Sequence, residues 1–220
     1  MGSGWSRAKR HDGFWRMAKK QNYRSRASFK LLQMDARYRL FRPGGVAVDL
    51  GASPGGWSQV AAEKVAPDGT VVAVDLDPVS PIAGVITMRG DLQDEGVLEL
   101  LEEALGDRLA HVVLSDMSPS LTGSYTIDHA RSVSLARTAL VVARRLLRPR
   151  GALVVKVFQG EEFPALLRLV ATDFTFCKAH TPKATRAASS ETYIVAKGFR
   201  RVAGASGVGL LPTHLDNEEE

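Results

Sequence analysis

The stretch VDLGASPGGWSQV, residues 48–60, contains the transition that decides the fold. An apolar run ends at Asp49 and Leu50, three glycines follow within six positions, and a helical pattern begins at Trp57. Glycines allow a sharp turn and let a ligand approach the backbone closely. A strand that passes through such a loop directly into a helix is typical of the first βα unit of a doubly wound sheet, which binds ligands beyond the carboxyl ends of its strands.

The rest of the chain alternates between strand and helix patterns in the same way. Short apolar runs predict seven strands, at 46–50, 70–76, 85–88, 111–115, 152–158, 174–179 and 192–196. Amphipathic stretches predict helices at 25–41, 57–66, 92–106, 128–148 and 161–172. We therefore expect an α/β, Rossmann-like fold with a seven-stranded, mostly parallel sheet and helices on both faces. The short polar link between the last two strands predicts one antiparallel edge strand.

Composition restricts the class of protein. The 220 residues, of which 45% are hydrophobic, are enough for one α/β domain with a substantial core. The single cysteine, Cys177, excludes a disulfide framework and a zinc site built from cysteines, so we predict no metal centre. The sequence contains neither an apolar run of membrane-spanning length nor the apolar segment of a signal peptide. We expect a cytoplasmic protein that does not enter a membrane.

Charge is distributed unevenly along the chain. Residues 1–42 contain twelve lysines and arginines but only two acids, whereas the whole chain has a net charge of +5. Trp5, Phe14, Trp15 and Tyr23 lie among these charges. A solvated arm and a surface that binds nucleic acid both fit this composition. We predict a basic N-terminal arm over 1–22, a folded domain over 23–200 and a C-terminal tail over 201–220.

The glycine loop does not match the common nucleotide-binding motifs. Its spacing differs from the dinucleotide pattern G-x-G-x-x-G, and no phosphate-binding G-x-x-x-x-G-K-[ST] motif is present. Asp75 ends the next predicted strand, where a carboxylate can accept both hydroxyls of a ribose. Asp91 follows the third strand, where it could contact an adenine amino group, although either acid alone also suits a turn or a helix cap. Together they favour an adenosine without a pyrophosphate, as in S-adenosylmethionine.

Several blocks resemble one known family in sequence and order. YRSRASFKL, VDLGASPGGWSQV, LSDMSP, VVKVFQG and SSETYIVA are similar to the motifs of the FtsJ family, S-adenosylmethionine-dependent methyltransferases that modify the ribose 2′-hydroxyl of RNA. The resemblance covers residues 10–200 and implies a class I methyltransferase fold. It also implies a monomer that acts on a uridine of 23S ribosomal RNA, in the large subunit or a late precursor.

The resemblance assigns roles to individual residues. It implies that the residues that contact the cofactor are Gly55, Trp57, Asp75, Asp91 and Asp116. It implies that the catalytic tetrad consists of Lys30, Asp116, Lys156 and Glu191. Ser120 stands where the family often has asparagine, so a substrate contact through that amide is in doubt, and the segment after Lys197 has no counterpart.

Lys156 also stands out without the family, because it lies inside the apolar run LVVKVF. An unpaired buried ammonium is costly, so this lysine is either paired with an acid for structure or used in chemistry. Methyl transfer to a ribose is an in-line displacement that needs alignment and a destination for the hydroxyl proton. Within the tetrad that the resemblance implies, Lys156 can accept that proton or orient the hydroxyl, Asp116 would orient Lys156, Glu191 would position a lysine, and Lys30 would hold the target ribose or phosphate. Without the resemblance, Lys30 and Glu191 read as surface charges.

Other functions fit the residues less well. A nicotinamide oxidoreductase lacks its fingerprint, a cytosine-C5 methyltransferase needs a thiolate, and DMSP differs from the (D/N)-P-P-(Y/F) loop of adenine methyltransferases. Two alternatives stay open. The substrate can be transfer RNA, or the chain can be a non-catalytic RNA-binding ribosome-assembly factor with a methyltransferase fold.

Overall fold

The computed structural model describes residues 13–186 and 188–200. The helices are α2 (Gly13–Lys20), α3 (Ser28–Tyr38), α4 (Gly56–Val65), α5 (Glu95–Leu105), α6 (Tyr125–Leu146) and α7 (Phe163–Asp173). The strands are β1 (Val46–Leu50), β2 (Thr70–Asp75), β3 (Val85–Arg89), β4 (Ala110–Ser115), β5 (Leu147–Phe158), β6 (Phe174–His180) and β7 (Glu191–Phe199). Within these ranges, no helix is both long and apolar enough to cross a membrane.

All seven strands form one sheet in the order β3-β2-β1-β4-β5-β7-β6. The first five in this order pair in parallel, and β7 is antiparallel to both β5 and β6. The predicted fold class is confirmed, with one refinement. The antiparallel strand lies next to the edge rather than at it. The connection from β5 through α7 leaves one position free before β6, and β7 then returns into that gap.

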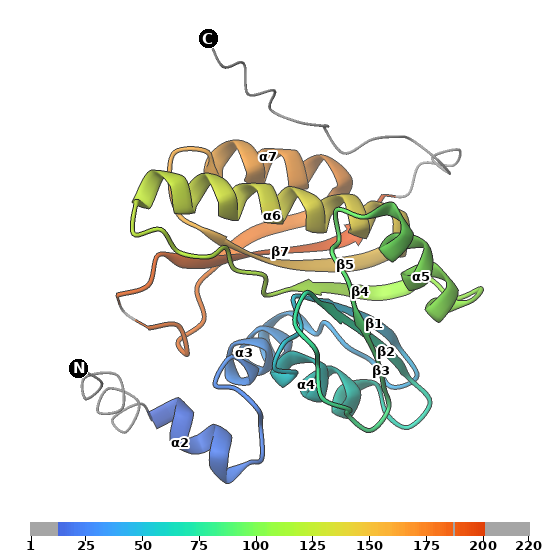
Figure 1. The fold of residues 1–220 in the computed structure, drawn as a ribbon. Coiled ribbons are helices and arrows are strands. Elements are labelled where there is room, and N and C mark those ends of the chain that lie inside the picture. The colour runs from blue at the N-terminus through green and yellow to red at the C-terminus, as the bar shows by residue number, and fades with distance from the viewer. Residues whose placement is uncertain (1–12, 187, 201–220) are drawn as a thin grey trace.

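Helices cover both faces of the sheet (Figure 1). On one face, α5, α6 and α7 pack over side chains such as Val48, Leu50 and Val155. On the other, α3 and α4 pack over the alternate side chains, such as Ala47 and Val154. Burial on both faces explains why the strands read as continuous apolar runs, and this burial is the main favourable term in the stability of the fold.

Element boundaries differ from the predicted ones where local chemistry intervenes. Helix α5 begins at Glu95 rather than at 92, because the Asp94 side chain accepts a hydrogen bond from the Gly96 N–H at 2.9 Å and caps the helix. Strand β5 begins at Leu147, well before 152. Residues 149–151 therefore belong to an irregular start of this strand, where Arg150 has a φ of 64° and the register with β4 shifts.

Helix α2 was not expected from the sequence. Its Ala18 is buried against Phe29 of α3 and Ala184 of the β6–β7 loop, and Phe14 and Tyr23 pack beside them. At least from Gly13 onward, therefore, the basic segment is attached to the domain rather than extended as a solvated arm. The rest of the predicted arm, residues 1–12, and the predicted tail, 201–220, lie outside the described residues.

Candidate functional site

The glycine loop joins β1 to α4 and requires glycine at two positions. Gly51 has a φ of 72°, and a side chain there would meet the backbone and side chain of Met117, the residue after Asp116. Gly55 has a φ of 107° and precedes the first residue of α4. Both conformations are unfavourable for other residues. The loop can therefore lie close against the segment that follows β4 and still turn directly into the helix.

A pocket of about 360 Å³ opens at the carboxyl ends of β1, β2 and β4. This is the position where the strand order reverses direction, between β1 and β4, and where doubly wound sheets bind ligands. Gly51 and Ser53 line it from the glycine loop, and Asp75, Asp91 and Asp116 line it from the ends of the other strands. The structure thus brings three of the five predicted cofactor residues into one pocket.

The charge of the pocket restricts its ligand. Its lining includes four aspartates, Asp77 among them, and neither lysine nor arginine. The Asp75 carboxylate is fixed by the backbone N–H groups of Ser53 and Asp77, at 2.8 Å each, which leaves lone pairs free toward the pocket. Such a lining would repel a pyrophosphate and suits a ligand that carries hydroxyls and positive charge. Adenosine attached to a sulfonium and an ammonium group, as in S-adenosylmethionine, fits this description.

The other two predicted cofactor residues do not line the pocket. Trp57 is only 3% exposed, packs on Tyr193 and donates its indole N–H to the carbonyl of Ala27 at 2.8 Å. Gly55 lies instead beside Arg24 and Ile82. The Trp57 side chain is therefore part of the core, and only backbone groups of the first turn of α4 remain available for a contact with a cofactor.

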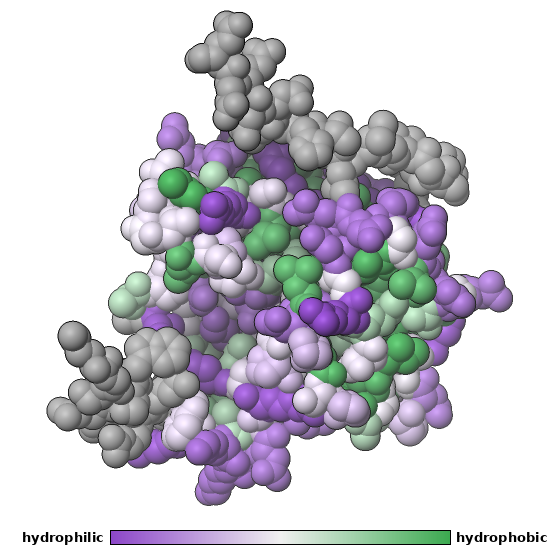
Figure 2. Space-filling view, viewed as in Figure 1, coloured by the Kyte–Doolittle hydropathy of each residue, from purple (hydrophilic) through white to green (hydrophobic). Residues whose placement is uncertain are grey.

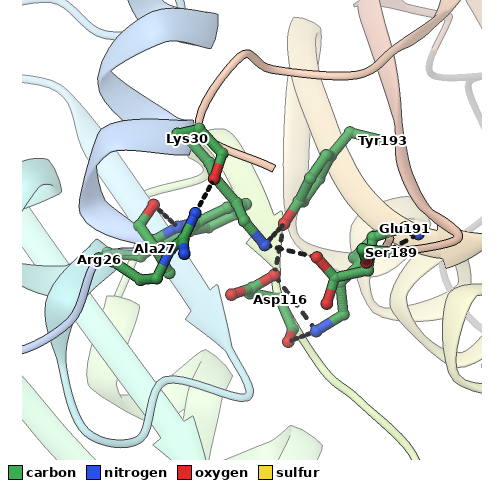
Figure 3. Close-up of polar contacts among 10 residues, drawn as sticks. Arg26, Ala27, Lys30, Asp116, Ser189, Glu191 and Tyr193 are labelled. Carbon is green, nitrogen blue, oxygen red and sulfur yellow. Dashed lines mark hydrogen bonds and ion pairs between the residues drawn. The ribbon is translucent and has the colours of Figure 1, made fainter. Parts of the chain in front are cut away.

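The four residues of the predicted tetrad lie in one cluster, in which Figure 3 labels Lys30, Asp116 and Glu191. Lys30 of α3 donates to Glu191 Oε2 at 2.6 Å. Lys156 of β5 donates to the Asp116 carbonyl oxygen at 2.6 Å, and its Nζ lies 3.3 Å from Asp116 Oδ1. Lys156 and Lys30 are only 6% and 8% exposed. Each buried lysine is therefore paired with its own carboxylate, as burial of an ammonium requires.

Tyr193 joins the two pairs and was not singled out from the sequence. Its hydroxyl accepts a hydrogen bond from Lys30 at 3.1 Å and donates one to Asp116 Oδ1 at 2.8 Å (Figure 3). Strand alternation places Tyr193 two residues after Glu191 on the same face of β7, opposite Lys156 in register. The two-residue spacing between Glu191 and Tyr193 in the block SSETYIVA is the sequence signal that could have identified Tyr193 as part of the site.

Electrostatics fix the ionisation states of Tyr193 and Glu191 in this network. Burial, together with the charges of Asp116 and Glu191, raises the pKa of Tyr193 well above its ordinary value, so the phenol stays neutral and keeps its proton to donate. Burial alone would raise the pKa of Glu191, but the charge and hydrogen bond of Lys30, the charge of Lys156 and a hydrogen bond with Ser189 together hold that pKa below its usual range. Glu191 is therefore ionised at neutral pH.

Asp49 is a further buried acid beneath the glycine loop. Burial raises its pKa to about 7, and the charges of Asp116 and Asp75 push in the same direction. Its Oδ2 accepts from the Ser58 hydroxyl at 2.6 Å, whereas its Oδ1 has no hydrogen-bond partner among the described residues. The run of apolar residues before Asp49 signals a buried strand, but it does not reveal this unsatisfied oxygen.

The remaining sequence predictions have clear structural positions. Within residues 13–186 and 188–200, no group of His, Cys, Asp and Glu is arranged to hold a metal ion. Burial raises the pKa of Cys177 to about 11, so its thiol is not a ready nucleophile. Ser120 follows Asp116 in the loop before α6, and its carbonyl accepts a hydrogen bond from Arg131.

Comparison with known proteins gives one consistent result. The model of the FtsJ-like methyltransferase family matches residues 23–199. The chain is 48% identical to the ribosomal RNA large subunit methyltransferase E of Halorubrum lacusprofundi, over 89% of this chain and 74% of that relative. It is 46% identical to the protein of the same name from Archaeoglobus fulgidus, over 88% and 98%. A crystal structure of a ribosomal RNA methyltransferase from Plasmodium falciparum superposes with a TM-score of 0.74 at 26% identity, covering 80% of this chain and 98% of that one.

Proposed function

The chain belongs to the FtsJ-like methyltransferase family, and from this premise we propose that it methylates a ribose 2′-hydroxyl of ribosomal RNA of the large subunit. Membership makes it an S-adenosylmethionine-dependent methyltransferase. One observation carries the proposal further. Asp116 both lines the acidic pocket and bonds the buried lysine Lys156, so the cofactor position and the candidate catalytic group meet at one residue.

S-adenosylmethionine, when bound, supplies a methyl group already activated on a sulfonium. In the proposed site, the Asp75 carboxylate would accept hydrogen bonds from the ribose hydroxyls of the cofactor, and Asp91 would contact its adenine. The Gly55 N–H already donates to the Ala52 carbonyl, whereas the backbone N–H of Trp57 in the first turn of α4 would be available to the methionine carboxylate. The positive end of the helix dipole favours a negative charge at that place. The negative lining of the pocket stabilises the positive charges of the ligand.

Lys156 contacts the target hydroxyl in the proposed reaction. The hydroxyl oxygen would attack the methyl group that the cofactor supplies, with the sulfur as leaving group. Lys156 would first release its own proton to solvent, and the neutral amine would then accept the hydroxyl proton. The observed contacts of Lys156 stabilise the ammonium that results, because both the carbonyl and a carboxylate oxygen of Asp116 lie within 3.3 Å of its Nζ. Tyr193 holds Asp116 in this position, and Glu191 holds Lys30 toward the target ribose or phosphate.

The proposed substrate is a uridine of 23S ribosomal RNA, in the assembled large subunit or a late precursor, and the enzyme acts as a monomer in the cytoplasm. Relatives named for the large-subunit RNA support this choice. The exposed cations Arg16, Lys19 and Lys20 of α2 also support an RNA substrate, because they lie on the helix that packs on α3, which carries Lys30. In this proposal residues 1–22 bind RNA and residues 23–200 form the methyltransferase domain.

Mapping of 2′-O-methyl groups on total RNA tests the proposed substrate. Cells with and without the gene are compared, and we expect one ribose mark on the large-subunit RNA to disappear in the deletion strain. Complementation with the unaltered gene restores that mark. A mark lost from transfer RNA, with ribosomal RNA unchanged, would support the transfer RNA alternative, and an unchanged methylation map would support the non-catalytic alternative.

A further inference from the structure

A second pocket opens at the same end of the sheet as the tetrad, where β5 terminates and β7 begins. It has a volume of about 330 Å³ and lies between the loop that follows β5, the first turn of α7, and the adjoining ends of β6 and β7. None of the residues that line it also lines the cofactor pocket. It is therefore a separate binding space.

The position of this pocket relates it to the tetrad. Thr192 lines it and directly follows Glu191, so the two side chains point to opposite faces of β7. Gln159 also lines it, three residues beyond Lys156, which corresponds to about 10 Å along a strand. About three stacked nucleotides cover that length, and an extended strand needs fewer. The two places lie on opposite faces of the sheet, so a bound RNA strand that passes around this end of the sheet can reach both.

Gln159 presents an unused hydrogen-bonding group at this pocket. Its backbone N–H donates to the Ser190 carbonyl at 2.9 Å, and its own carbonyl accepts from the Tyr125 hydroxyl. The side chain is exposed, and its amide has no hydrogen-bond partner among the described residues. The backbone is thus fixed on both sides while the amide remains free to bind. An amide offers both a donor and an acceptor, which matches the edge of a nucleobase.

The rest of the lining is uncharged and partly apolar. Phe163 and Pro164 contribute apolar surface, and the Thr192 hydroxyl contacts the Thr181 hydroxyl at 3.2 Å. The lining contains no Lys, Arg, Asp or Glu, and the ring of its histidine, His180, packs edge-on against Tyr38 at 5.3 Å. Such a pocket lacks the cations that bind a phosphate, and it suits a flat, uncharged group with hydrogen-bonding edges.

We propose that this pocket binds a nucleobase of the substrate RNA, from a nucleotide within about three positions of the methylated ribose. The inference rests on the proposed function and adds to it a subsite for a neighbouring nucleotide. The surface beside the pocket supports it, since Tyr125, whose hydroxyl bonds the Gln159 carbonyl, is 59% exposed. Exposed flat and apolar side chains are a favourable surface for unstacked bases.

Two substitutions test the subsite in the full-length enzyme. Ala179→Leu fills the pocket from β6, and Gln159→Ala removes the free amide without touching the backbone hydrogen bonds. The substrate is large subunits purified from cells that lack the gene. We expect Ala179→Leu to raise KM for subunits roughly 5- to 150-fold, which is the range for losing one stacked base. Gln159→Ala should also raise KM, by a factor near the lower limit of that range. S-adenosylmethionine affinity and kcat should stay near the unaltered values.

Ala171→Leu is the matched control, because Ala171 is an exposed alanine in the last turn of α7, outside the pocket. It should leave KM unchanged. If Ala179→Leu fails to fold, Gln159→Ala still tests the proposal, because Gln159 is exposed and its substitution should not affect folding. An unchanged KM in that variant overturns the subsite proposal. If the unaltered enzyme transfers no methyl group to subunits, the proposed function fails instead.

Photo-crosslinking identifies the occupant directly. A benzophenone side chain is placed at position 179, with position 171 as the control, and the enzyme is irradiated on the same subunits. Crosslinks from position 179 should map to one base within about three nucleotides of the methylated ribose. Crosslinks to a ribosomal protein, or only to distant RNA, would overturn the proposal even if KM rises.

Discussion

The hydroxyl of Tyr193 lies 2.8 Å from Oδ1 of Asp116, and this contact links two otherwise separate lysine–carboxylate pairs. On one side Lys30 is paired with Glu191, and on the other Lys156 is paired with Asp116. The phenol is fully buried and neutral, so it acts as a fixed bridge between them. The four tetrad residues and Tyr193 therefore form one network of five residues in this structure.

Tyr193→Phe should uncouple the two pairs. The ring keeps its packing on Trp57, but Lys30 and Asp116 each lose one buried hydrogen bond. We expect a loss of about 1–3 kcal/mol in the free energy of unfolding, measured in urea, and a fall in the single-turnover methyl-transfer rate. Tyr38→Phe, on α3, is the control. A variant as active and stable as the unaltered enzyme would show that the bridge has no role.

Asp75→Ala should weaken cofactor binding. It removes the carboxylate that the N–H groups of Ser53 and Asp77 fix beside the pocket. Calorimetry should give an S-adenosylmethionine affinity lower by about 1–3 kcal/mol, with no effect for the exposed Asp68→Ala. Titration of the unaltered enzyme with NAD should give no binding. Binding of NAD but not of S-adenosylmethionine would refute our account of the acidic pocket.

Asp49→Asn should change the pH dependence of stability. The pKa of Asp49 is about 7 in the folded protein and 3.8 in the reference state, so between about pH 4 and pH 7 the folded state holds a proton that the unfolded chain has released. This group therefore makes the free energy of unfolding fall as pH rises through that window, and its effect is constant above it.

Asparagine cannot titrate, so the difference between Asp49→Asn and the unaltered protein should grow by roughly 2–4 kcal/mol in favour of the variant from pH 4 to pH 7. Urea unfolding at several pH values measures this difference, and the exposed Asp68→Asn is the control. Parallel pH profiles for the two proteins would mean that Asp49 is already ionised at low pH.

The cations of α2 should contribute to RNA affinity in a salt-dependent way. Arg16 and Lys20 are exposed, so Arg16→Ala with Lys20→Ala leaves the packing of Ala18 intact. For a 23S ribosomal RNA transcript, we expect weaker binding and a plot of log Kd against log salt that is less steep by about 1–2, with unchanged cofactor affinity. Arg137→Ala with Arg168→Ala removes the same charge from α6 and α7 and serves as the control. Equal slopes for both pairs would exclude α2 from the RNA interface.

The sequence predicted the features that depend on local patterns. Continuous apolar runs gave the strands, and the glycines at 51 and 55 gave the loop, because both patterns follow directly from burial and backbone geometry. The four tetrad residues came from ordered motifs, and the structure brings them together.

Features that depend on tertiary packing were missed. Helix α2 is stabilised by Ala184, far away in the sequence, so its short basic pattern reads as solvated. Trp57 looks like a ligand contact next to a glycine loop, yet its side chain is held by Ala27 and Tyr193. Tyr193 reads as an ordinary strand residue until the register with β5 places it opposite Lys156.

Methyl transfer by Lys156 variants tests the central claim most directly. Lys156→Ala should fold and bind S-adenosylmethionine, because Asp116 keeps its contact with Tyr193, but its single-turnover rate on undermethylated large subunits should fall about 10²–10⁴-fold. Lys156→Arg keeps the charge but cannot accept a proton, so we expect it to be about as inactive as alanine. Substantial activity in the arginine variant would mean that Lys156 orients the hydroxyl rather than receiving its proton. A folded Lys156→Ala enzyme with near-normal turnover would contradict the account.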